Sequence, residues 1–565
     1  MDTINKDVVI YGATFSACVC ALRIARTGKQ VAIVAPEKQL GGMITGGLGI
    51  TDAANVRIWW GEAQEFADAM SAKTGYTTPR LKWNFPARYA KEWVDATIMA
   101  EDNIELFLGE SIYSVARDGY LSKGGYLADS NNFGKIREIV TAQNKFKASV
   151  FIDGSYSGML IAKANVKHGI GRQPKSLFHE IAAGRLINDE PQFKQDLTDE
   201  DGDLMNWAQF VETSTEGSAM AMGFRLMVTN DPARSVGWPA PPNYNENDFQ
   251  DEILDANRNG SLYNKLLGFR VFKRVVYNDM YCREVMPDYE AATTKQREEF
   301  WLSYSKSKIE RLAYLDEFAT NGADFGGPLT WEYASTTDEA RRKEIREQIM
   351  YKMLGRFHTF AHSEKVPKKI RDGMAEIGLT NNNFENDYIG VPGWSHELYQ
   401  RNGRYLQGAS VINEKHVLNE SRWADQVAVC GYFMDSKYIQ QIATSNGKSI
   451  RDGDYQATYF ETDDGSHKGR LERYRYFGIP MSAMVTEPGV CDNLISIWCI
   501  SATNGAFNAI RLEPSLSNVA LAGAEMAIES VESNVPASML SYSRVRKRLE
   551  DANAVLYRYF DGKGV

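Results

Sequence analysis

Short runs of apolar residues near the start of the chain alternate with residues that form turns. Asp7–Tyr11 and Gln30–Ala35 are β-branched and almost wholly apolar, a pattern typical of strands buried on both faces of a parallel sheet. Between them, Cys18–Thr27 carries apolar residues at helical spacing and stops at Gly28. The pattern therefore predicts strand, turn, helix and strand, the unit in which a helix N-terminus faces the pyrophosphate of a dinucleotide.

Similar patterns recur further along the chain. Ile104–Val115 and Ile136–Ile152 are predicted to form strands, and Asp338–His362 one long amphipathic helix. No run of about 18 apolar residues occurs, so the sequence predicts no membrane-spanning helix.

The turn after the first strand is a degenerate form of the glycine motif G-x-G-x-x-G. Gly12 keeps the first position, Thr14 holds the second, and Ala17 holds the third, where alanine is acceptable. The carboxylate that usually ends the second strand is displaced, because Ala35 occupies that place and Glu37 is the nearest acid. Taken alone, this motif leaves a structural unit without nucleotide as an equal alternative.

A glycine-rich segment follows directly. Five glycines stand within the nine positions 41–49, a density that opposes a stable helix or strand. A flexible linker would be polar, yet this segment carries Leu40, Met43, Ile44 and Leu48. The composition favours a loop whose backbone packs against a flat ring system.

These motifs resemble those of a known family. The Tyr-Gly-x-Thr turn, Leu-Gly-Gly-Met and the 46–52 segment are similar to FAD-dependent oxidoreductases of the glutathione-reductase-like superfamily, in the branch often mislabelled xanthan-lyase-like. Phe151–Gly158 resembles the segment that returns the chain to the FAD. Further matching segments follow in the family's order towards the C-terminus: Gly478–Pro480, Asp492–Ile495, Cys499–Thr503 and Ala509–Pro514.

The resemblance implies the fold and the cofactor. It implies an α/β protein with a Rossmann-like FAD-binding domain (a parallel sheet plus a β-meander), formed by residues 1–170 and 478–565. An α+β substrate domain with insertions, residues 171–477, is expected between them. The residues expected to hold FAD are Gly12, Thr14, Phe15, Ser16, Ala17, Ala35, Pro36, Glu37, Gly41, Gly42, Met43, Thr45, Gly46, Ile112, Asp153, Gly154, Gly158, Asn504 and Ile510.

The expected reaction is a two-electron oxidation of a CH–NH or CH–OH substrate at flavin N5. Such a reaction needs a base for the heteroatom proton and groups that orient the substrate. The catalytic candidates are Lys437, Asn504, Arg511 and Glu513. The resembling family commonly has histidine where Lys437 and Asn504 stand. The alternatives are a surface lysine on a helix for Lys437, and a structural pair or helix cap for Arg511 and Glu513.

Substrate-binding candidates lie in the central part of the chain. Tyr388 is a candidate pocket wall, and Arg401 and Arg404, three residues apart, would share a helix face and clamp a carboxylate or phosphate. A solvated helix face explains the two arginines equally well. The seven histidines form no metal-binding motif, so we expect no metal.

Charge adds one more alternative. The net charge is −9, but residues 341–371 hold ten Lys and Arg against three acids. Such a band can follow a phosphate backbone, and relatives of these flavoproteins occur in phage pathways that remodel amino-acid-substituted thymidines. Amine oxidation with C–N cleavage on such a modified thymidine in DNA is therefore an alternative to a small-molecule substrate, and a solvated helix is the simpler explanation of the band.

A non-catalytic flavoprotein is the second alternative.

Six scattered cysteines and the absence of a signal peptide predict a cytoplasmic protein without a membrane partner. The sequence leaves the oligomeric state open.

Overall fold

The computed structural model describes most of the chain. The described residues are 1–51, 58–75, 81–118, 134–180, 183–184, 219–258, 272–274, 286–288, 291–293, 295–297, 299–300, 317–320, 324–384, 390–418, 423–443, 449–453, 455–456, 459–461, 468–470 and 476–557. Tyr388, a predicted substrate-binding residue, lies outside them.

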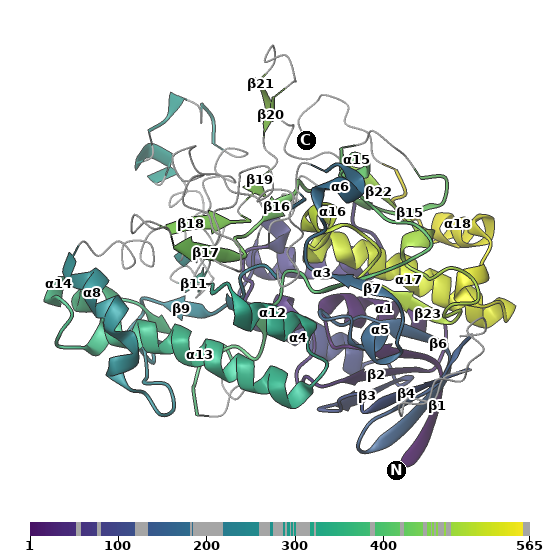
Figure 1. Ribbon diagram of the computed structural model, residues 1–565, viewed down its shortest axis with the longest axis horizontal. Coiled ribbons are helices and arrows are strands. Elements are labelled where there is room, and N and C mark those ends of the chain that lie inside the picture. Colours follow the sequence, from purple (N-terminus) through teal and green to yellow (C-terminus); the bar gives the residue numbers. More distant parts are fainter. Residues whose placement is uncertain are drawn as a thin grey trace.

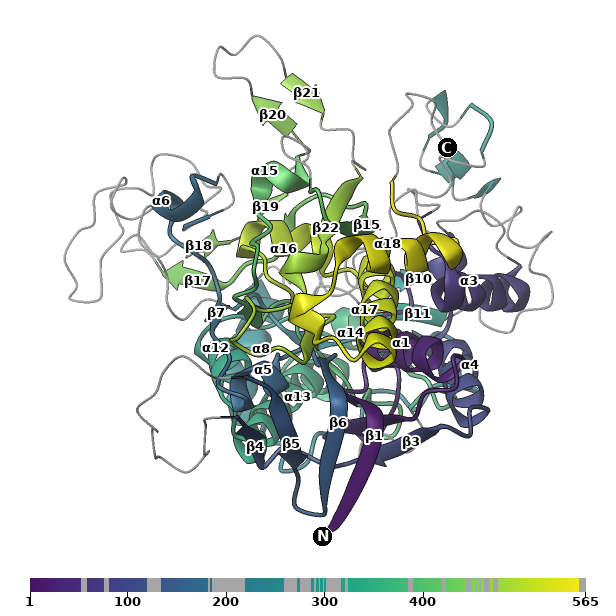
Figure 2. The same ribbon diagram turned by 90° about the vertical axis from the view of Figure 1, so that its right-hand side faces the viewer.

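A seven-stranded sheet forms the centre of the fold, in the order β3–β2–β1–β6–β5–β4, with β23 also paired to β6. Its strands are β1 (Asp2–Tyr11), β2 (Val31–Ala35), β3 (Ile104–Leu108), β4 (Ser114–Arg117), β5 (Ile136–Val140), β6 (Asn144–Asp153) and β23 (Leu494–Ser496). β1, β2, β3, β6 and β23 pair in parallel, whereas β4 and β5 pair antiparallel. The protein is therefore mixed α/β with a parallel-dominated sheet (Figure 2).

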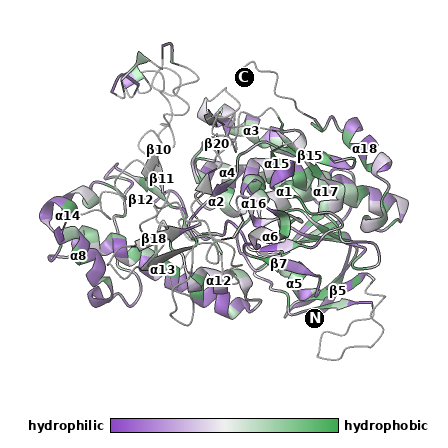
Figure 3. Ribbon diagram, turned by 45° about the horizontal axis from the view of Figure 1, so that its top comes forward, coloured by the Kyte–Doolittle hydropathy of each residue, from purple (hydrophilic) through white to green (hydrophobic). Residues whose placement is uncertain are grey.

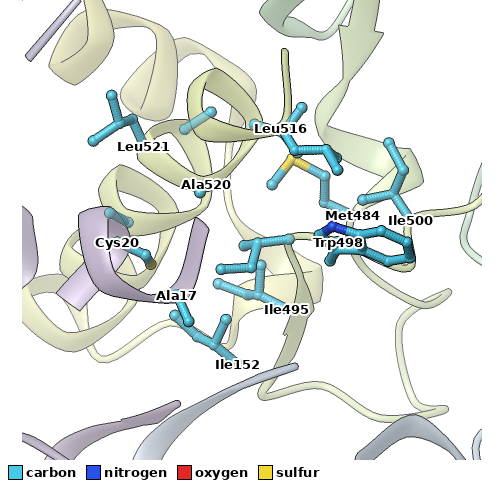
Figure 4. Close-up of a cluster of buried hydrophobic side chains, with 14 of the residues drawn as sticks. Ala17, Cys20, Ile152, Met484, Ile495, Trp498, Ile500, Leu516, Ala520 and Leu521 are labelled. Atoms are coloured by element: carbon cyan, nitrogen blue, oxygen red, sulfur yellow. The ribbon is translucent and has the colours of Figure 1, made fainter. Parts of the chain in front are cut away.

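The N-terminal and C-terminal parts of the chain meet on this sheet. α1 (Phe15–Ala25) packs along α17 (Glu513–Ser533), so both helices are almost entirely buried. In Figure 4, Ala17 and Cys20 of α1 lie beside Ala520 and Leu521 of α17, above Ile152. Arg23 closes the contact with an ion pair to Glu525 at 2.7 Å. Burial on several sides explains why both helices are apolar beyond one face.

A second hydrophobic core gathers residues between 219 and 398. This core is built around the helix α13 (Glu339–His362). Asp338 caps the N-terminus of α13, because its carboxylate accepts a hydrogen bond from the Ala340 amide at 2.9 Å. α8 (Gln250–Arg258), α12 (Pro328–Ser335) and α14 (Lys368–Ala375) pack against α13 (Figure 1). Hydrophilic residues are spread over α8 and α14 (Figure 3).

The first core, around the seven-stranded sheet, also takes in buried residues of the segments 405–418 and 427–434, such as Tyr405 and Val429. The boundaries of the predicted substrate domain stay a prediction.

The remaining elements are short. Further strands are β7 (His168–Ile170), β8 (Gly223–Phe224), β9 (Met227–Thr229), β10 (Phe272–Arg274), β11 (Glu317–Thr320), β12 (Gly378–Leu379), β13 (Leu398–Tyr399), β14 (Arg404–Leu406), β15 (Gln426–Cys430), β16 (Asp435–Ser436), β17 (Gln440–Ala443), β18 (Ser449–Asp452), β19 (Tyr455–Gln456), β20 (Tyr459–Glu461), β21 (Lys468–Arg470) and β22 (Phe477–Pro480). Further helices are α2 (Gly42–Thr45), α3 (Gly61–Thr74), α4 (Ala87–Met99), α5 (Met159–Lys163), α6 (Lys175–Phe178), α15 (Glu414–Val417), α16 (Asn504–Ile510) and α18 (Tyr542–Asp551).

Most elements predicted from the pattern are present, with corrected lengths. The two predicted strands Ile104–Val115 and Ile136–Ile152 each divide into two strands, because a turn interrupts each run. Within the described part of the chain, no helix combines the length and the apolar character needed to cross a membrane.

Candidate functional site

The turn after β1 packs against the turn after β6. Gly12 has φ +110°, and a Cβ there would lie 2.6 Å from the backbone nitrogen of Ser155. The Thr14 hydroxyl donates to the carbonyl of Gly154 at 2.6 Å and accepts from the amide of Ala17 at 3.1 Å. Thr14 thus joins the two turns and caps α1 at once, which explains how threonine serves in the second glycine position.

The N-terminus of α1 is suited to bind an anion. The first amides of a helix have no intrahelical partner, and the helix dipole makes this end positive. Phe15 and Ser16 form the first turn, both fully buried, and the Ser16 hydroxyl has no hydrogen-bond partner among the described residues. The predicted strand, turn and helix are therefore present, and the binding of a phosphate at this turn stays a prediction.

A carboxylate stands just beyond β2. β2 ends at the buried Ala35, and Pro36 follows. Glu37 has one buried oxygen, Oε2, for which the described part of the chain supplies no hydrogen-bond partner. Burial raises the pKa of Glu37, and the nearby Arg346 and Arg342 of α13 oppose that effect. A carboxylate at this end of the second strand is the residue type that holds ribose hydroxyls.

The glycine-rich segment forms tight contacts with the rest of the site. The Gly41 amide donates to Ala13 at 2.8 Å. A Cβ on Gly42 would meet the Tyr156 hydroxyl at 2.4 Å, and one on Gly46 would meet Cβ of Glu397 at 2.6 Å. These glycines are needed because neighbouring groups approach the backbone closely.

The expectation that this segment contains no helix is wrong for one turn. Gly42–Thr45 forms α2, whose flanking residues are Gly41 with φ +90° and Gly46. The Thr45 hydroxyl stabilises the turn by donating to the Leu40 carbonyl at 2.5 Å, so one local hydrogen bond offsets the low helix propensity of glycine.

The glycine-rich segment meets the start of α17 through a tyrosine. The Tyr156 hydroxyl donates to Oε1 of Glu513 at 2.6 Å and accepts from the Met43 amide at 2.8 Å. Burial raises the pKa of Glu513 to about 7, against the opposing effect of the Tyr156 hydrogen bond. The second oxygen of Glu513 is buried, and no residue that the structure describes forms a hydrogen bond with it.

Glu397, which sequence reasoning missed, is also buried near this network. Its pKa is raised by burial and by the nearby charge of Glu37, while Arg346 opposes the rise. No motif singled it out, because its importance comes from the packing of its chain segment against Gly46.

Four predicted cofactor residues have structural contacts of their own. The Asp153 carboxylate accepts from the amides of Ser155 at 3.0 Å and Ile161 at 2.9 Å, so it holds the turn before α5. Gly158 has φ +62° and lies against Arg404. Ile510 is fully buried at the end of α16. Ile112 is also buried, and its amide donates to Tyr11 at 3.5 Å.

Asn504, the first residue of α16, is held firmly. Its Oδ1 accepts from Asn402 at 2.9 Å and from the Tyr405 hydroxyl at 2.8 Å, and its backbone amide donates to Gln173 at 2.8 Å. These bonds fix the orientation of a buried side-chain amide. Such a group can position a substrate without proton transfer.

Arg511 and Glu513 do not pair with each other. Arg511 donates to the Tyr399 hydroxyl at 2.9 Å and lies 3.4 Å from Oδ2 of Asp435. Lys437 follows β16 and is half-buried, so the alternative of a surface lysine on a helix is wrong. Its charge helps to lower the pKa of Asp324.

The prediction that Arg401 and Arg404 share a helix face is also wrong. Arg404 begins β14 and Arg401 precedes that strand, so their side chains enter different networks. Arg401 pairs with the buried Asp324 at 2.9 Å, together with Arg225. Sequence reasoning missed Asp324 because nothing local marks a partner 77 residues away.

Arg404 lies beside the turn after β6. It donates to the Ser157 carbonyl at 2.9 Å and to the Ser335 carbonyl, and its Nε is buried without a partner. Burial lowers its pKa to about 10, helped by the charge of Arg342. Within the described residues, no carboxylate forms an ion pair with it, so Arg404 is a buried cation whose charge is met only by carbonyl groups.

The basic band 341–371 is largely neutralised within the fold. Six of its ten cations form ion pairs with carboxylates: Arg341 with Glu332, Arg342 with Glu339, Lys343 with Glu347, Arg356 with Glu252, Lys365 with Glu246 and Lys368 with Asp372. This pairing favours the simpler explanation of a solvated, internally compensated helix.

A cavity of about 470 Å³ lies between the glycine-rich segment and α4. Its lining includes Thr45 and Gln39, together with Arg88, Lys91 and Phe384. It is open space directly beside the predicted cofactor loop.

Comparison with known proteins identifies the family. A model of the FAD dependent oxidoreductases matches residues 7–549, nearly the whole chain. The chain belongs to this family. It is an oxidoreductase enzyme with FAD as its cofactor. No curated protein matches the sequence significantly.

Three solved structures each resemble only part of this FAD dependent oxidoreductase. L-proline dehydrogenase from P. horikoshii is 12% identical over 30% of this chain and 25% of its own, with a TM-score of 0.17. THI4 from Thermovibrio ammonificans is 18% identical over 30% of this chain and 67% of its own, with a TM-score of 0.21. Glycine oxidase from Geobacillus kaustophilus is 12% identical over 29% of this chain and 60% of its own, with a TM-score of 0.20. Similarities this low do not indicate which substrate this protein binds.

The described residues fit FAD. Among the described residues, Ser16 and Glu37 each have a buried oxygen without a hydrogen-bond partner, at the N-terminus of α1 and just beyond the end of β2. Polar groups in such positions are expected to be satisfied when the full ligand is bound. They lie along the elements that the sequence assigned to the cofactor.

Proposed function

We propose that this oxidoreductase removes two electrons from a CH–NH or CH–OH bond of a small-molecule substrate, as a member of the glutathione-reductase-like flavoproteins. The observation that carries the proposal is the contact between the glycine-rich segment and the start of α17 through Tyr156 and Glu513. These are the two segments that the resemblance assigns to the flavin. When bound, FAD supplies the two-electron acceptor.

The cofactor's polar groups have matching protein groups. The N-terminus of α1, with Ser16, suits the diphosphate, and Glu37 suits a ribose. Arg404 lies beside the Gly158 turn as a buried cation without a carboxylate partner, so we assign it to the diphosphate rather than to the substrate. The binding energy of the diphosphate would then offset the cost of burying this arginine.

Glu513 is our candidate for the base. The substrate carbon loses a hydrogen with its two electrons, and the nitrogen or oxygen loses a proton, which gives a C=N or C=O product. A pKa near 7 suits a group that accepts this proton at neutral pH. The unpartnered oxygen of Glu513 is available for that contact, while Tyr156 fixes the other oxygen.

Asn504 is a positioning group in this proposal. Its oxygen is occupied by Asn402 and Tyr405, so its amide nitrogen is held in one direction. A substrate that meets this fixed donor loses little conformational freedom at that contact.

The test begins with the purified full-length protein. We expect bound FAD with the visible absorbance of oxidised flavin, and bleaching of that absorbance under anaerobic conditions by one member of a panel of amines and alcohols. A protein that is colourless and takes up no FAD would refute the proposal. FAD that no CH–NH or CH–OH compound reduces would favour the non-catalytic alternative.

DNA remains an alternative substrate to test. The paired cations of the basic band give it no support. Affinity for duplex DNA that falls steeply with salt would revive it.

A further inference from the structure

A buried carboxylate in this protein is shared by two arginines. Oδ1 of Asp324 accepts from Arg225 at 2.9 Å, and Oδ2 accepts from Arg401 at 2.9 Å. The three side chains are only 2–3% exposed. Burial opposes ionisation of Asp324, but the two arginines outweigh it and hold its pKa well below the usual range. Two cations and one anion leave one positive charge that this group does not neutralise.

A third arginine reaches the same place through a tyrosine. The Tyr399 ring lies under both guanidinium groups, with its centroid 4.4 Å from Arg401 and 5.0 Å from Arg225. Its hydroxyl accepts from Arg511 at 2.9 Å. The pKa of Arg401 is lowered by burial and by the charges of Arg225 and Arg511, although Asp324 opposes this. Cations are therefore crowded here, and we call Arg225, Arg401 and Arg511, with Asp324 and Tyr399, the arginine cluster.

The arginine cluster borders the elements assigned to the flavin. A Cβ on Gly47, within the glycine-rich segment, would lie 2.2 Å from the carbonyl oxygen of Arg225. Arg511 stands two residues before Glu513, the first residue of α17. The cluster thus touches both segments from the side of the second core, to which Phe224 and Leu226 beside Arg225 belong.

We propose that the arginine cluster binds a carboxylate of the substrate, so that the oxidised compound is a small amino acid or hydroxy acid. The inference rests on the proposed function, which places the reacting bond near Glu513. Among the described residues, Arg225 and Arg401 share the single carboxylate of Asp324, and an incoming second carboxylate offsets the cost of burying the extra positive charge. Planar guanidinium groups also match a carboxylate with two hydrogen bonds.

The binding test uses the FAD-loaded enzyme and simple probes. Acetate and propionate are titrated against their uncharged counterparts, acetamide and propionamide, and both the flavin absorbance and the melting temperature are followed. We expect the two carboxylates to change both signals and the two amides to change neither. Carboxylates that bind no better than the amides would overturn the inference.

Two variants separate anion binding from a structural role. Arg401→Gln is expected to weaken acetate binding by about tenfold or more. Arg172→Gln, which breaks another buried arginine–aspartate pair, the one with Asp452, is expected to leave it unchanged. Equal acetate affinity in Arg401→Gln and the unaltered enzyme would contradict the inference.

Asp324→Asn gives an independent test, because removing the competing carboxylate leaves the cations in excess. We expect this variant to be less stable without ligand but to gain more in melting temperature from acetate than the unaltered protein does. A smaller gain would contradict the inference.

The inference and the proposed function fail in different ways. Bound flavin that an amine or alcohol reduces, without any carboxylate binding, overturns only the arginine cluster's role. Absence of FAD overturns the proposed function, while the melting-temperature response to acetate still tests the cluster.

Discussion

The Tyr156 hydroxyl donates to the Glu513 carboxylate at 2.6 Å, across 357 residues of sequence. Because the same hydroxyl accepts from the Met43 amide, one side chain joins the turn after β6, the glycine-rich segment and the start of α17. A carboxylate held this way in a buried site keeps its orientation and a raised pKa at the same time. Glu513 is thereby set up to exchange a proton near neutral pH.

We expect Glu513→Gln to reduce the pH dependence of stability. The pKa of Glu513 rises from 4.5 to about 7 on folding, so the folded protein holds this proton more tightly than the unfolded chain does. The free energy of unfolding therefore falls as pH rises through that interval, by about 3 kcal/mol from this residue. Glutamine does not titrate, so the free energy of unfolding of the variant should lack this part of the decrease with rising pH.

The measurement is a pair of denaturation curves for each protein, at about pH 5 and about pH 8. Tyr156→Phe is the matched control, because it removes the hydrogen bond but keeps the titrating carboxyl. An unchanged pH dependence in Glu513→Gln would show that the pKa of Glu513 is not raised in the folded protein.

Gly12→Ala is expected to abolish FAD binding or folding. The new Cβ would lie 2.6 Å from the Ser155 backbone, and the residue would also keep a φ of +110°. Gly28→Ala is a close control, because Gly28 has φ +84° but no atom within 4 Å of its added Cβ. The control should cost about 1–2 kcal/mol of conformational strain alone.

FAD content after purification and the melting temperature compare the two glycine variants. If Gly12→Ala keeps its FAD and loses no more stability than Gly28→Ala, the close approach of the two turns is not needed.

Local sequence patterns predicted the elements that local interactions build. The alternation around Gly12 gave β1, α1 and β2 within a few residues, and the long amphipathic run gave α13. The glycine motif placed Thr14 in the turn after β1. Its hydrogen bond to the Gly154 carbonyl could not be predicted, because Gly154 is distant in sequence. Long-range pairs are set by how the sheet and the second core pack together, and one sequence does not display that packing.

The arginine spacing shows where such reasoning fails. Arg401 and Arg404 are three apart, as on a helix, yet the segment between them is extended or irregular, with Asn402 and Gly403 favouring a turn. Each arginine finds a separate partner, Asp324 or the Ser157 carbonyl. Spacing alone predicts a shared face only where the secondary structure is secure.

Arg404→Met is expected to weaken FAD binding by about tenfold or more, because a buried charged hydrogen-bond donor to the diphosphate is lost. Arg117→Met is the matched control. Arg117 is also buried and also donates to carbonyl groups, those of Ala164 and Val490, but it lies at the end of β4. Both variants should lose stability, and only Arg404→Met should lose FAD affinity.

Flavin fluorescence during titration of the apoprotein measures that affinity directly. Equal FAD affinity in the two variants would assign Arg404 to the fold rather than to the cofactor.

Lys437→Met is expected to raise the apparent substrate dissociation constant and to leave the limiting rate of flavin reduction unchanged. Lys437 was a candidate base from its sequence position, but its charge acts on the buried Asp324 of the arginine cluster. This interaction places Lys437 near the arginine cluster. The lysine then adds to the positive field that holds an anionic substrate.

Rapid mixing of enzyme and substrate without oxygen separates the two constants, and Lys437→Arg should restore binding. A lower limiting rate at unchanged affinity, most severe at low pH, would instead make Lys437 the base and remove Glu513 from that role.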